Sequence, residues 1–402
     1  MEIYLKKFPD EKQCGHFIWL IARYYLGNSN KEKAIEYFSR GITEYPDSSY
    51  TSYSRFWLNK IKPAENVNSD ELMEEFAAYN PEGYHTLSLL KLYSDKTEVL
   101  KLSTKFEEAR SKKDIKQMLL FHSLLFFKNG YDNSFNKRIR QIDPDITDPY
   151  QKLSDLINNP SYKSSYKSIL QAIELYFYAG DTKSINREIN LIPEDDVIAQ
   201  KDIALAMTVY SIKHKHYNYS THYAFRLLNL LELKENLSLM PQVFSEALYP
   251  YAFADCVKNE SRRSVVKPEL ILAMMKVESN FNHNATSPAD AAGLMQLMPD
   301  TAKGISKELG ISKYELTDPC TSIKFGAKYI AWLDRYYKGR IEYMVAAYNA
   351  GAGNVNIWGK KSVSKDLDYF SEFIPFDETR DYIFRTKKCI IQYENIYKNF
   401  GK

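Results

Sequence analysis

Residues 18–46, IWLIARYYLGNSNKEKAIEYFSRGITEYP, are the stretch that decides the fold class. Apolar residues recur at helical spacing on both sides of Gly27, and the second run stops at Pro46. Because glycine can end a helix in the left-handed region and proline cannot continue one, the stretch predicts a pair of helices. Similar aromatic-rich runs end at Gly130 and Gly180, which indicates that the pair is repeated.

The same stretch follows much of the tetratricopeptide spacing, at Ala22, Tyr25, Ala34, Phe38 and Pro46. Trp19 lies one place off that pattern, and Gly41 replaces a small alanine. Helix pairs of this kind cannot bury their apolar faces alone, so they stack into a solenoid. We therefore predict that residues 1–248 form an α-helical superhelical domain. Its aromatic residues are expected in the helix–helix core, with a glycan-contacting inner surface as the alternative.

The composition of the whole chain agrees with a helical, multidomain protein. The 402 residues include only 15 glycines and 15 prolines, with 44% hydrophobic and 26% charged residues. The length exceeds what one core usually supports, and the net charge of +3 gives no reason to expect a nucleic-acid partner. The 32 tyrosines suit helix packing and sugar stacking equally well.

The chain changes character near Leu248, because nine of the 15 glycines follow residue 250. Residues 268–279, PELILAMMKVES, predict an amphipathic helix that begins with a proline and carries Glu278 in its last turn. The helix dipole and burial beside the apolar face both raise the pKa of a carboxyl group there. A general acid that works near neutral pH needs such a pKa, although a lone glutamate at a helix end is more often a surface residue.

Four further motifs follow in order: Glu278-Ser279, Gly293-Leu-Met-Gln296, Ala347-Tyr-Asn-Ala-Gly351 and Glu378-Thr-Arg-Asp-Tyr382. Together they resemble the catalytic domain of soluble lytic transglycosylases, across residues 249–402. That resemblance implies a lysozyme-like, mainly α-helical catalytic domain that cleaves peptidoglycan. The helical residues 1–248 resemble, more weakly, the superhelical domain that precedes this unit in the larger members. The fold class expected is therefore all-α.

The resemblance also implies roles for individual residues. Glu278 matches the single catalytic acid/base, and the expected substrate-binding residues are Ser287, Gln296, Met298, Tyr348, Asn349 and Glu378. Gly293, Gly351 and Gly353 are expected to form turns, which allow a close approach of the backbone. Tyr348 has a packing role as its alternative, and Arg380 is left out of the site as an ordinary ion-pairing residue.

The family's mechanism needs only one carboxylate. Glu278 would protonate the glycosidic oxygen and then remove the proton of the C6 hydroxyl, which attacks the anomeric carbon and leaves a 1,6-anhydro-N-acetylmuramoyl end. Where the family commonly has glycine, this chain has Asp290. We expect Asp290 to be a solvated turn residue; the alternative is that it activates water in a lysozyme-like muramidase. A second alternative is a non-catalytic scaffold that only binds glycan or a partner.

Other site signatures are missing. The sequence contains no H-E-x-x-H, P-loop or G-x-S-x-G motif, so we expect neither a cofactor nor a metal. The four widely spaced cysteines indicate neither a disulfide framework nor a metal site. No apolar window is long enough to span a membrane.

The expected partners and location follow from the resemblance. They are peptidoglycan strands in the periplasm and, through the helical domain, cell-wall synthesis or divisome proteins. Because residues 1–13 show no export signal, we expect one upstream of Met1 in the full gene product, or a trimmed chain beginning at Met1.

Overall fold

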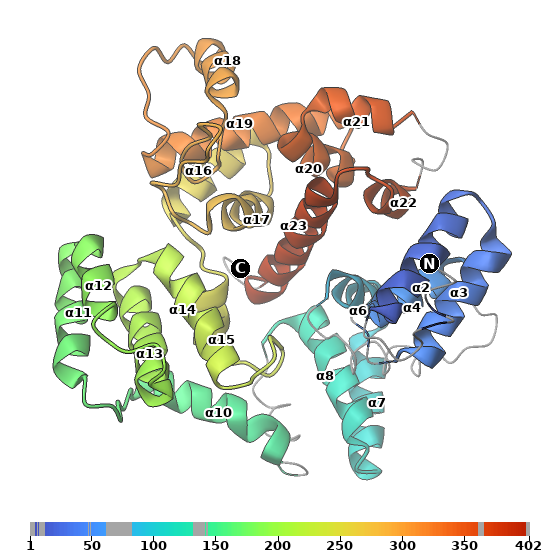
Figure 1. The fold of residues 1–402 in the computed structure, drawn as a ribbon, viewed down its shortest axis with the longest axis horizontal. Coiled ribbons are helices and arrows are strands. Elements are labelled where there is room, and N and C mark those ends of the chain that lie inside the picture. The colour runs from blue at the N-terminus through green and yellow to red at the C-terminus, as the bar shows by residue number, and fades with distance from the viewer. Residues whose placement is uncertain are drawn as a thin grey trace. The chain divides into compact units, whose positions relative to one another are not determined.

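The computed structural model of the chain describes residues 5, 7, 13–46, 48, 50–61, 83–131, 141, 144–360 and 366–398. Nearly all of these residues lie in helices or in the turns between them (Figure 1). Within this part of the chain the only β pairing consists of isolated antiparallel bridges, Thr286 with Ala292 and Ala292 with Leu297. The expected all-α fold is confirmed.

The chain forms two compact units, and each unit combines two separate stretches of the sequence. The first unit combines residues 1–142 with residues 358–376, and the second combines residues 143–357 with residues 377–402. The boundary at residue 248 that the sequence indicates stays a prediction.

The first unit is built from helices that pack against their neighbours in sequence, α2 against α3, α3 against α4 and α7 against α8. Its helices are α2 (Cys14–Gly27), α3 (Lys31–Glu44), α4 (Thr51–Ile61), α6 (Tyr84–Lys96), α7 (Val99–Ser111), α8 (Ile115–Asn129) and α22 (Leu367–Glu372). The substitution of alanine by Gly41 is explained here, since a Cβ atom at that position would lie 3.2 Å from the side chain of Ile18.

The glycines expected to end helices behave differently from one another. Gly180 follows its helix in the left-handed region with φ 71°, and Gly130 has φ 80°. At Gly27 the expectation is wrong: Gly27 is the last residue of α2, and Ser29 takes the left-handed conformation with φ 61°. A Cβ atom at Gly27 would lie 2.8 Å from the ring of Phe373, so close packing is the reason for glycine there.

The second unit begins with a further run of paired helices, in which α11 packs on α12 and α13 on α14. These helices are α10 (Pro144–Asn158), α11 (Lys167–Ala179), α12 (Thr182–Ile189), α13 (Val197–His214), α14 (Tyr217–Leu230) and α15 (Gln242–Leu248). Asp181 and Asp196 cap α12 and α13 by accepting hydrogen bonds from backbone N–H groups of the first turn.

The rest of the second unit carries the motifs. It contains α16 (Ala254–Ser264), α17 (Pro268–Ser279), α18 (Pro299–Leu309), α19 (Pro319–Tyr337), α20 (Ile341–Ala350), α21 (Ala352–Trp358), which ends at the unit boundary, and α23 (Asp377–Ile396). Helix α17 packs along α23, and α23 also contacts α20 (Figure 1). These contacts bring motifs that lie about 100 residues apart in sequence into one site.

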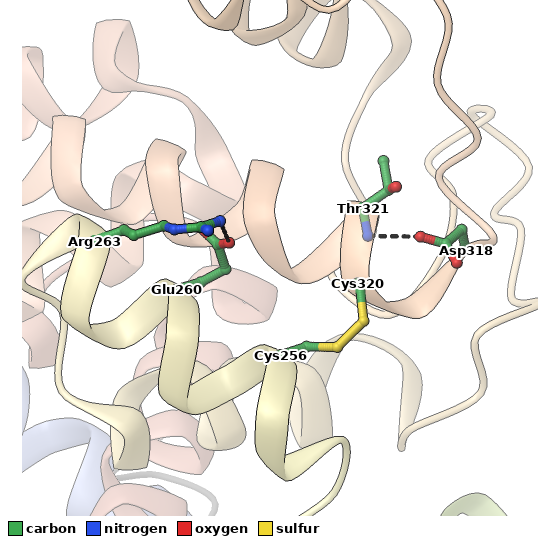
Figure 2. The surroundings of a disulfide bond; sticks show 6 residues. All are labelled: Cys256, Glu260, Arg263, Asp318, Cys320 and Thr321. Carbon is green, nitrogen blue, oxygen red and sulfur yellow. Dashed lines mark hydrogen bonds and ion pairs between the residues drawn. A yellow bond between two sulfur atoms is a disulfide. The ribbon is translucent and has the colours of Figure 1, made fainter.

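A disulfide corrects the expectation from cysteine spacing. Cys256 on α16 is bonded to Cys320 at the start of α19, with a Cα–Cα distance of 5.3 Å (Figure 2). The start of α19 is also fixed by Asp318, whose carboxylate accepts a hydrogen bond from the N–H of Thr321. The two cysteines are 64 residues apart, so only the packing of α16 on α19 brings them together. Cys14 and Cys389 are buried and are not part of this disulfide.

Candidate active site

Helix α17 carries Glu278 into a largely buried position. Pro268 begins the helix, and five consecutive residues, 271–275, are buried. The helix ends abruptly at Asn280, which has a left-handed φ of 46°. Ser279 fixes this end by donating a hydrogen bond from its hydroxyl to the carbonyl of Leu294, at 2.9 Å.

The carboxyl group of Glu278 has an unusual pKa. Burial raises the pKa of Glu278 to about 7, against the opposing effects of a hydrogen bond from Tyr382 and the charge of Arg385. Burial is one of the two causes of a raised pKa that the sequence predicts, and the structure confirms it. Near neutral pH a large fraction of Glu278 is therefore protonated and able to act as an acid.

Tyr382 is the direct partner of Glu278. It lies in α23, is almost fully buried, and donates a hydrogen bond from its hydroxyl to Oε1 of Glu278. Burial raises the pKa of Tyr382 well above its usual value, so it stays a neutral donor. Its hydroxyl also lies 3.6 Å from the sulfur of Met274, one helical turn before Glu278.

Tyr348, in α20, also lies near Glu278. Its hydroxyl donates a hydrogen bond to the carbonyl of Met295 at 2.7 Å, and its ring centroid is 5.2 Å from that of Tyr329. Burial, followed by the negative charge of Glu278, raises the pKa of Tyr348 well above 10. Tyr348 thus has a packing partner and also lies within the electrostatic reach of Glu278.

The turn that contains Gly293 depends on that glycine. Its φ is 75°, and a Cβ atom there would lie 1.8 Å from the carbonyl oxygen of Leu316, so a side chain is excluded. Gln296 braces the turn, because its amide nitrogen donates to the carbonyls of Ala285 at 3.0 Å and Gly293 at 2.9 Å. The substrate-contacting role of Gln296 stays a prediction, beside this structural role.

Ser287 and Asp290 lie before that turn, and Met298 lies after it. The hydroxyl of Ser287 accepts hydrogen bonds from the N–H groups of Ala289 and Ala291, at 3.2 and 3.0 Å. Asp290 lies in the same exposed turn, with a left-handed φ of 62°. Met298 precedes α18 and is 45% exposed, which leaves its side chain accessible to a ligand.

The remaining predicted residues lie at the end of α20, in α21 and at the start of α23. Asn349 accepts a hydrogen bond through Oδ1 from the hydroxyl of Thr379, at 2.7 Å. Glu378 lies exposed in the first turn of α23. Gly351 ends α20 with φ 81°, whereas Gly353 lies inside α21 and has no left-handed backbone. The turn expected at Gly351 is present, and the turn expected at Gly353 is not, because Gly353 lies inside a helix.

Sequence reasoning quoted Tyr382 and Thr379 without assigning them a role. Both lie on the buried face of α23, in the run Thr379, Tyr382, Ile383 and Thr386. Helical spacing in the motif was the signal that could have found them, since Thr379 and Tyr382 are three residues apart and share a face. In the part of the chain that the structure describes, no group of three or more His, Cys, Asp or Glu side chains could hold a metal ion.

The region that carries the motifs is similar to known proteins. Residues 255–370 match the Transglycosylase SLT domain. The chain is similar to soluble lytic murein transglycosylase of Escherichia coli, with 34% identity over 160 residues, 39% of this chain and 24% of that protein. Membrane-bound lytic murein transglycosylase C of Edwardsiella ictaluri is 31% identical over 187 residues, 40% of this chain and 51% of that protein. The chain thus spans about a quarter of the length of its soluble relative.

Solved lytic transglycosylases were matched over most of the chain. The 70-kDa soluble lytic transglycosylase of Escherichia coli aligns with a TM-score of 0.49 and 17% identity, covering 94% of this chain and 62% of that one. The lytic transglycosylase Slt of Pseudomonas aeruginosa aligns with a TM-score of 0.44 and 21% identity, covering 93% and 62%. Among the described residues, no helix has the length and apolar character that crossing a membrane requires.

Proposed function

We propose that the protein is a peptidoglycan lytic transglycosylase. It cleaves the β-1,4 bond between N-acetylmuramic acid and N-acetylglucosamine and leaves a 1,6-anhydro-N-acetylmuramoyl end. The observation that carries this proposal is the partly buried carboxyl of Glu278, whose pKa is raised by burial to about 7 within a segment that matches the Transglycosylase SLT domain.

The chemistry needs one group that first gives and then takes a proton. Protonated Glu278 donates its proton to the glycosidic oxygen as the bond from that oxygen to C1 of the muramic acid breaks. The resulting carboxylate removes the proton of the C6 hydroxyl, whose oxygen forms the new bond to C1. No water is consumed, and Glu278 ends the cycle protonated again. Since the nucleophile belongs to the substrate, its orientation replaces an external reactant.

The surroundings of Glu278 suit both halves of this cycle. Burial favours the protonated form before the first transfer, while the Tyr382 hydrogen bond and the positive charge of Arg385 stabilise the carboxylate after it. Among the described residues, no second carboxylate interacts with Glu278. Asp290 lies in an exposed turn, so nothing favours it as the water-activating base of a hydrolase.

The binding roles belong to the same proposal. Ser287, Gln296, Met298, Asn349 and Glu378 contact the glycan strand, and Tyr348 lines the site beside the scissile bond. The exposed side chains of Met298 and Glu378 support this assignment, because they are accessible to a substrate. Cell-wall synthesis or divisome proteins as partners of the helical part stay a prediction.

The location proposed is the periplasm, where this substrate lies. The Cys256–Cys320 disulfide supports a site outside the cytosol, because such bonds persist in oxidising compartments.

The experiment that tests the proposal is the turnover of purified peptidoglycan by Glu278→Gln. Glutamine keeps an oxygen that can accept the Tyr382 hydrogen bond but cannot donate or take the proton. We expect turnover to fall by roughly 10²–10⁴-fold while binding of the glycan is retained. The matched control is Glu308→Gln on the exposed face of α18, which should leave turnover unchanged. Full turnover by Glu278→Gln would remove Glu278 from the mechanism.

A further inference from the structure

The two sides of α17 differ in what they face. At 100° per residue, Lys276 and Asn280 lie on the opposite side of the helix from Glu278. Two cavities open on that opposite side, against α14. Their volumes are about 340 and 320 Å³, and both are lined by His222 and Asn280. We call these two adjoining cavities the rear groove.

One end of the rear groove carries an excess of positive charge. Lys276, Arg385 and Lys388 line it, with Glu235 as the only carboxylate among its lining residues. Glu235 is already engaged, because it forms an ion pair with Lys388 at 2.9 Å and accepts a hydrogen bond from the hydroxyl of Tyr249. Arg385 is likewise paired with Asp381, at 2.7 Å. Basic side chains still outnumber carboxylates in the lining of the groove.

Lys276 shows this excess most clearly. Its amino group donates to the carbonyl of Leu248 at 2.7 Å and lies 4.8 Å from the centroid of the Tyr249 ring. Within the described residues it has no ion pair with a carboxylate. Burial lowers the pKa of Lys276, and the negative charge of Glu235 offsets that cost only in part, so an anionic group of a ligand would gain by entering here.

The other end of the groove is rich in amide groups. It is lined by Asn186, Asn218, Asn280 and Asn282 together with Tyr219 and Ser279. Amide side chains both donate and accept hydrogen bonds, which suits the N–H and C=O groups of a peptide. Phe225 and Val277 at the basic end add apolar surface for short side chains.

We propose that the rear groove binds a short peptide with a free carboxyl group, the carboxylate beside Lys276 and Arg385 and the peptide groups along the asparagines. This inference rests on the proposed function, because the peptide stems of peptidoglycan are one source of such a ligand. Free peptides released from the wall are the other. The groove gives the paired helices that precede the catalytic motifs a part in recognition, since α12 and α14 contribute to its lining.

Occupation of the groove should affect the catalytic acid through Arg385. The positive charge of Arg385 lowers the pKa of Glu278, and Arg385 also lines the basic end. A bound carboxylate would offset that charge and raise the pKa of Glu278. The occupied enzyme is then active to a higher pH than the empty enzyme.

The test measures binding of the dipeptide L-alanyl-D-glutamate to the whole chain by calorimetry, with the same dipeptide amidated at both carboxyl groups as the uncharged probe. We expect saturable binding of the acidic form, at least about tenfold weaker binding of the amidated form, and a similar loss in Lys276→Met. Lys307→Met, on the exposed surface of α18, is the matched control. Absence of binding, or equal binding by Lys276→Met and the unaltered chain, would overturn the proposal.

Digestion of two substrates assigns the source of the peptide. If the stem occupies the groove, Lys276→Met raises the KM for peptide-bearing glycan and leaves that for stem-free glycan unchanged. If free peptide is the occupant, neither KM changes, and added dipeptide shifts the pH profile of the unaltered enzyme upward. A chain that cleaves neither glycan would contradict the proposed function, while the calorimetry would still test the groove.

Discussion

Two tyrosines of the first compact unit and two of the second serve different purposes. In the first unit, rings pack on rings: Tyr50 stacks on His16 with centroids 4.3 Å apart, and Tyr53 lies 4.4 Å from His85. In the second unit, Tyr348 and Tyr382 are fixed by hydrogen bonds from their hydroxyl groups, one to a backbone carbonyl and one to Glu278. The same residue type therefore stabilises helix packing in one unit and arranges a buried carboxyl in the other.

The difference teaches that a high tyrosine content says little about substrate until burial and partners are known. A ring that only packs contributes to stability in proportion to its buried surface. A buried hydroxyl with a charged partner changes the pKa of that partner. Substitutions in the two units should therefore change different measured quantities.

The largest expected effect is on the stability of the first unit. Trp57 is 1% exposed, and its ring lies edge-on to Tyr369 with centroids 4.8 Å apart. Trp57→Ala should lower the free energy of unfolding by about 3–5 kcal/mol, because it leaves a cavity. Denaturant titration measures this, and the turnover of the folded protein should not change. Trp332→Ala, at an exposed position of α19, is the control, expected within about 1 kcal/mol. Loss of turnover in folded Trp57→Ala would break the comparison.

The next effect is on catalysis in the second unit. Tyr382→Phe removes the hydrogen bond that lowers the pKa of Glu278, so that pKa should rise above about 7. The upper limb of the pH–activity profile should therefore move up by roughly one pH unit. Turnover at neutral pH should fall roughly 10–100-fold, because the carboxylate form of Glu278 loses its hydrogen-bond donor. Tyr348→Phe, which removes a hydroxyl bonded to a carbonyl instead, should leave the limb in place. Equal profiles for all three proteins would contradict the assigned role of Tyr382.

The smallest expected effect is the pH dependence of stability. Since burial raises the pKa of Glu278 from 4.5 to about 7, its stabilising contribution is full below pH 4.5 and is lost as the pH rises through about 7. Glu278→Gln lacks this loss, so it should gain roughly 1–3 kcal/mol relative to the unaltered chain between pH 5 and pH 8. Thermal unfolding at the two pH values measures the gain. A constant difference would mean that the pKa of Glu278 is not raised.

Local patterns predicted the helices and the position of Glu278 because both depend on nearby residues. The periodicity and the proline of residues 268–279 suffice for a helix that ends beside a carboxyl group. The expectation failed where distant segments decide the outcome. Gly27 is required by the ring of Phe373, and Cys256 pairs with Cys320 across 64 residues.

Contacts between side chains that are distant in sequence could not be predicted from local patterns either. The Tyr382 hydroxyl reaches Glu278 only because α23 packs along α17. The cationic side chains of the rear groove come from two helices, α17 and α23, which are distant in sequence. No spacing rule within one segment connects such residues, so their roles follow from the structure.

Mass spectrometry of peptidoglycan digested by the whole chain tests the central claim most directly. In the proposed reaction one partly buried carboxyl, that of Glu278, carries out both proton transfers, and no water is consumed. This mechanism predicts that the new muramic acid ends are 1,6-anhydro ends, one water lighter than reducing ends. Reducing ends as the main product would contradict it and would identify the enzyme as a hydrolase.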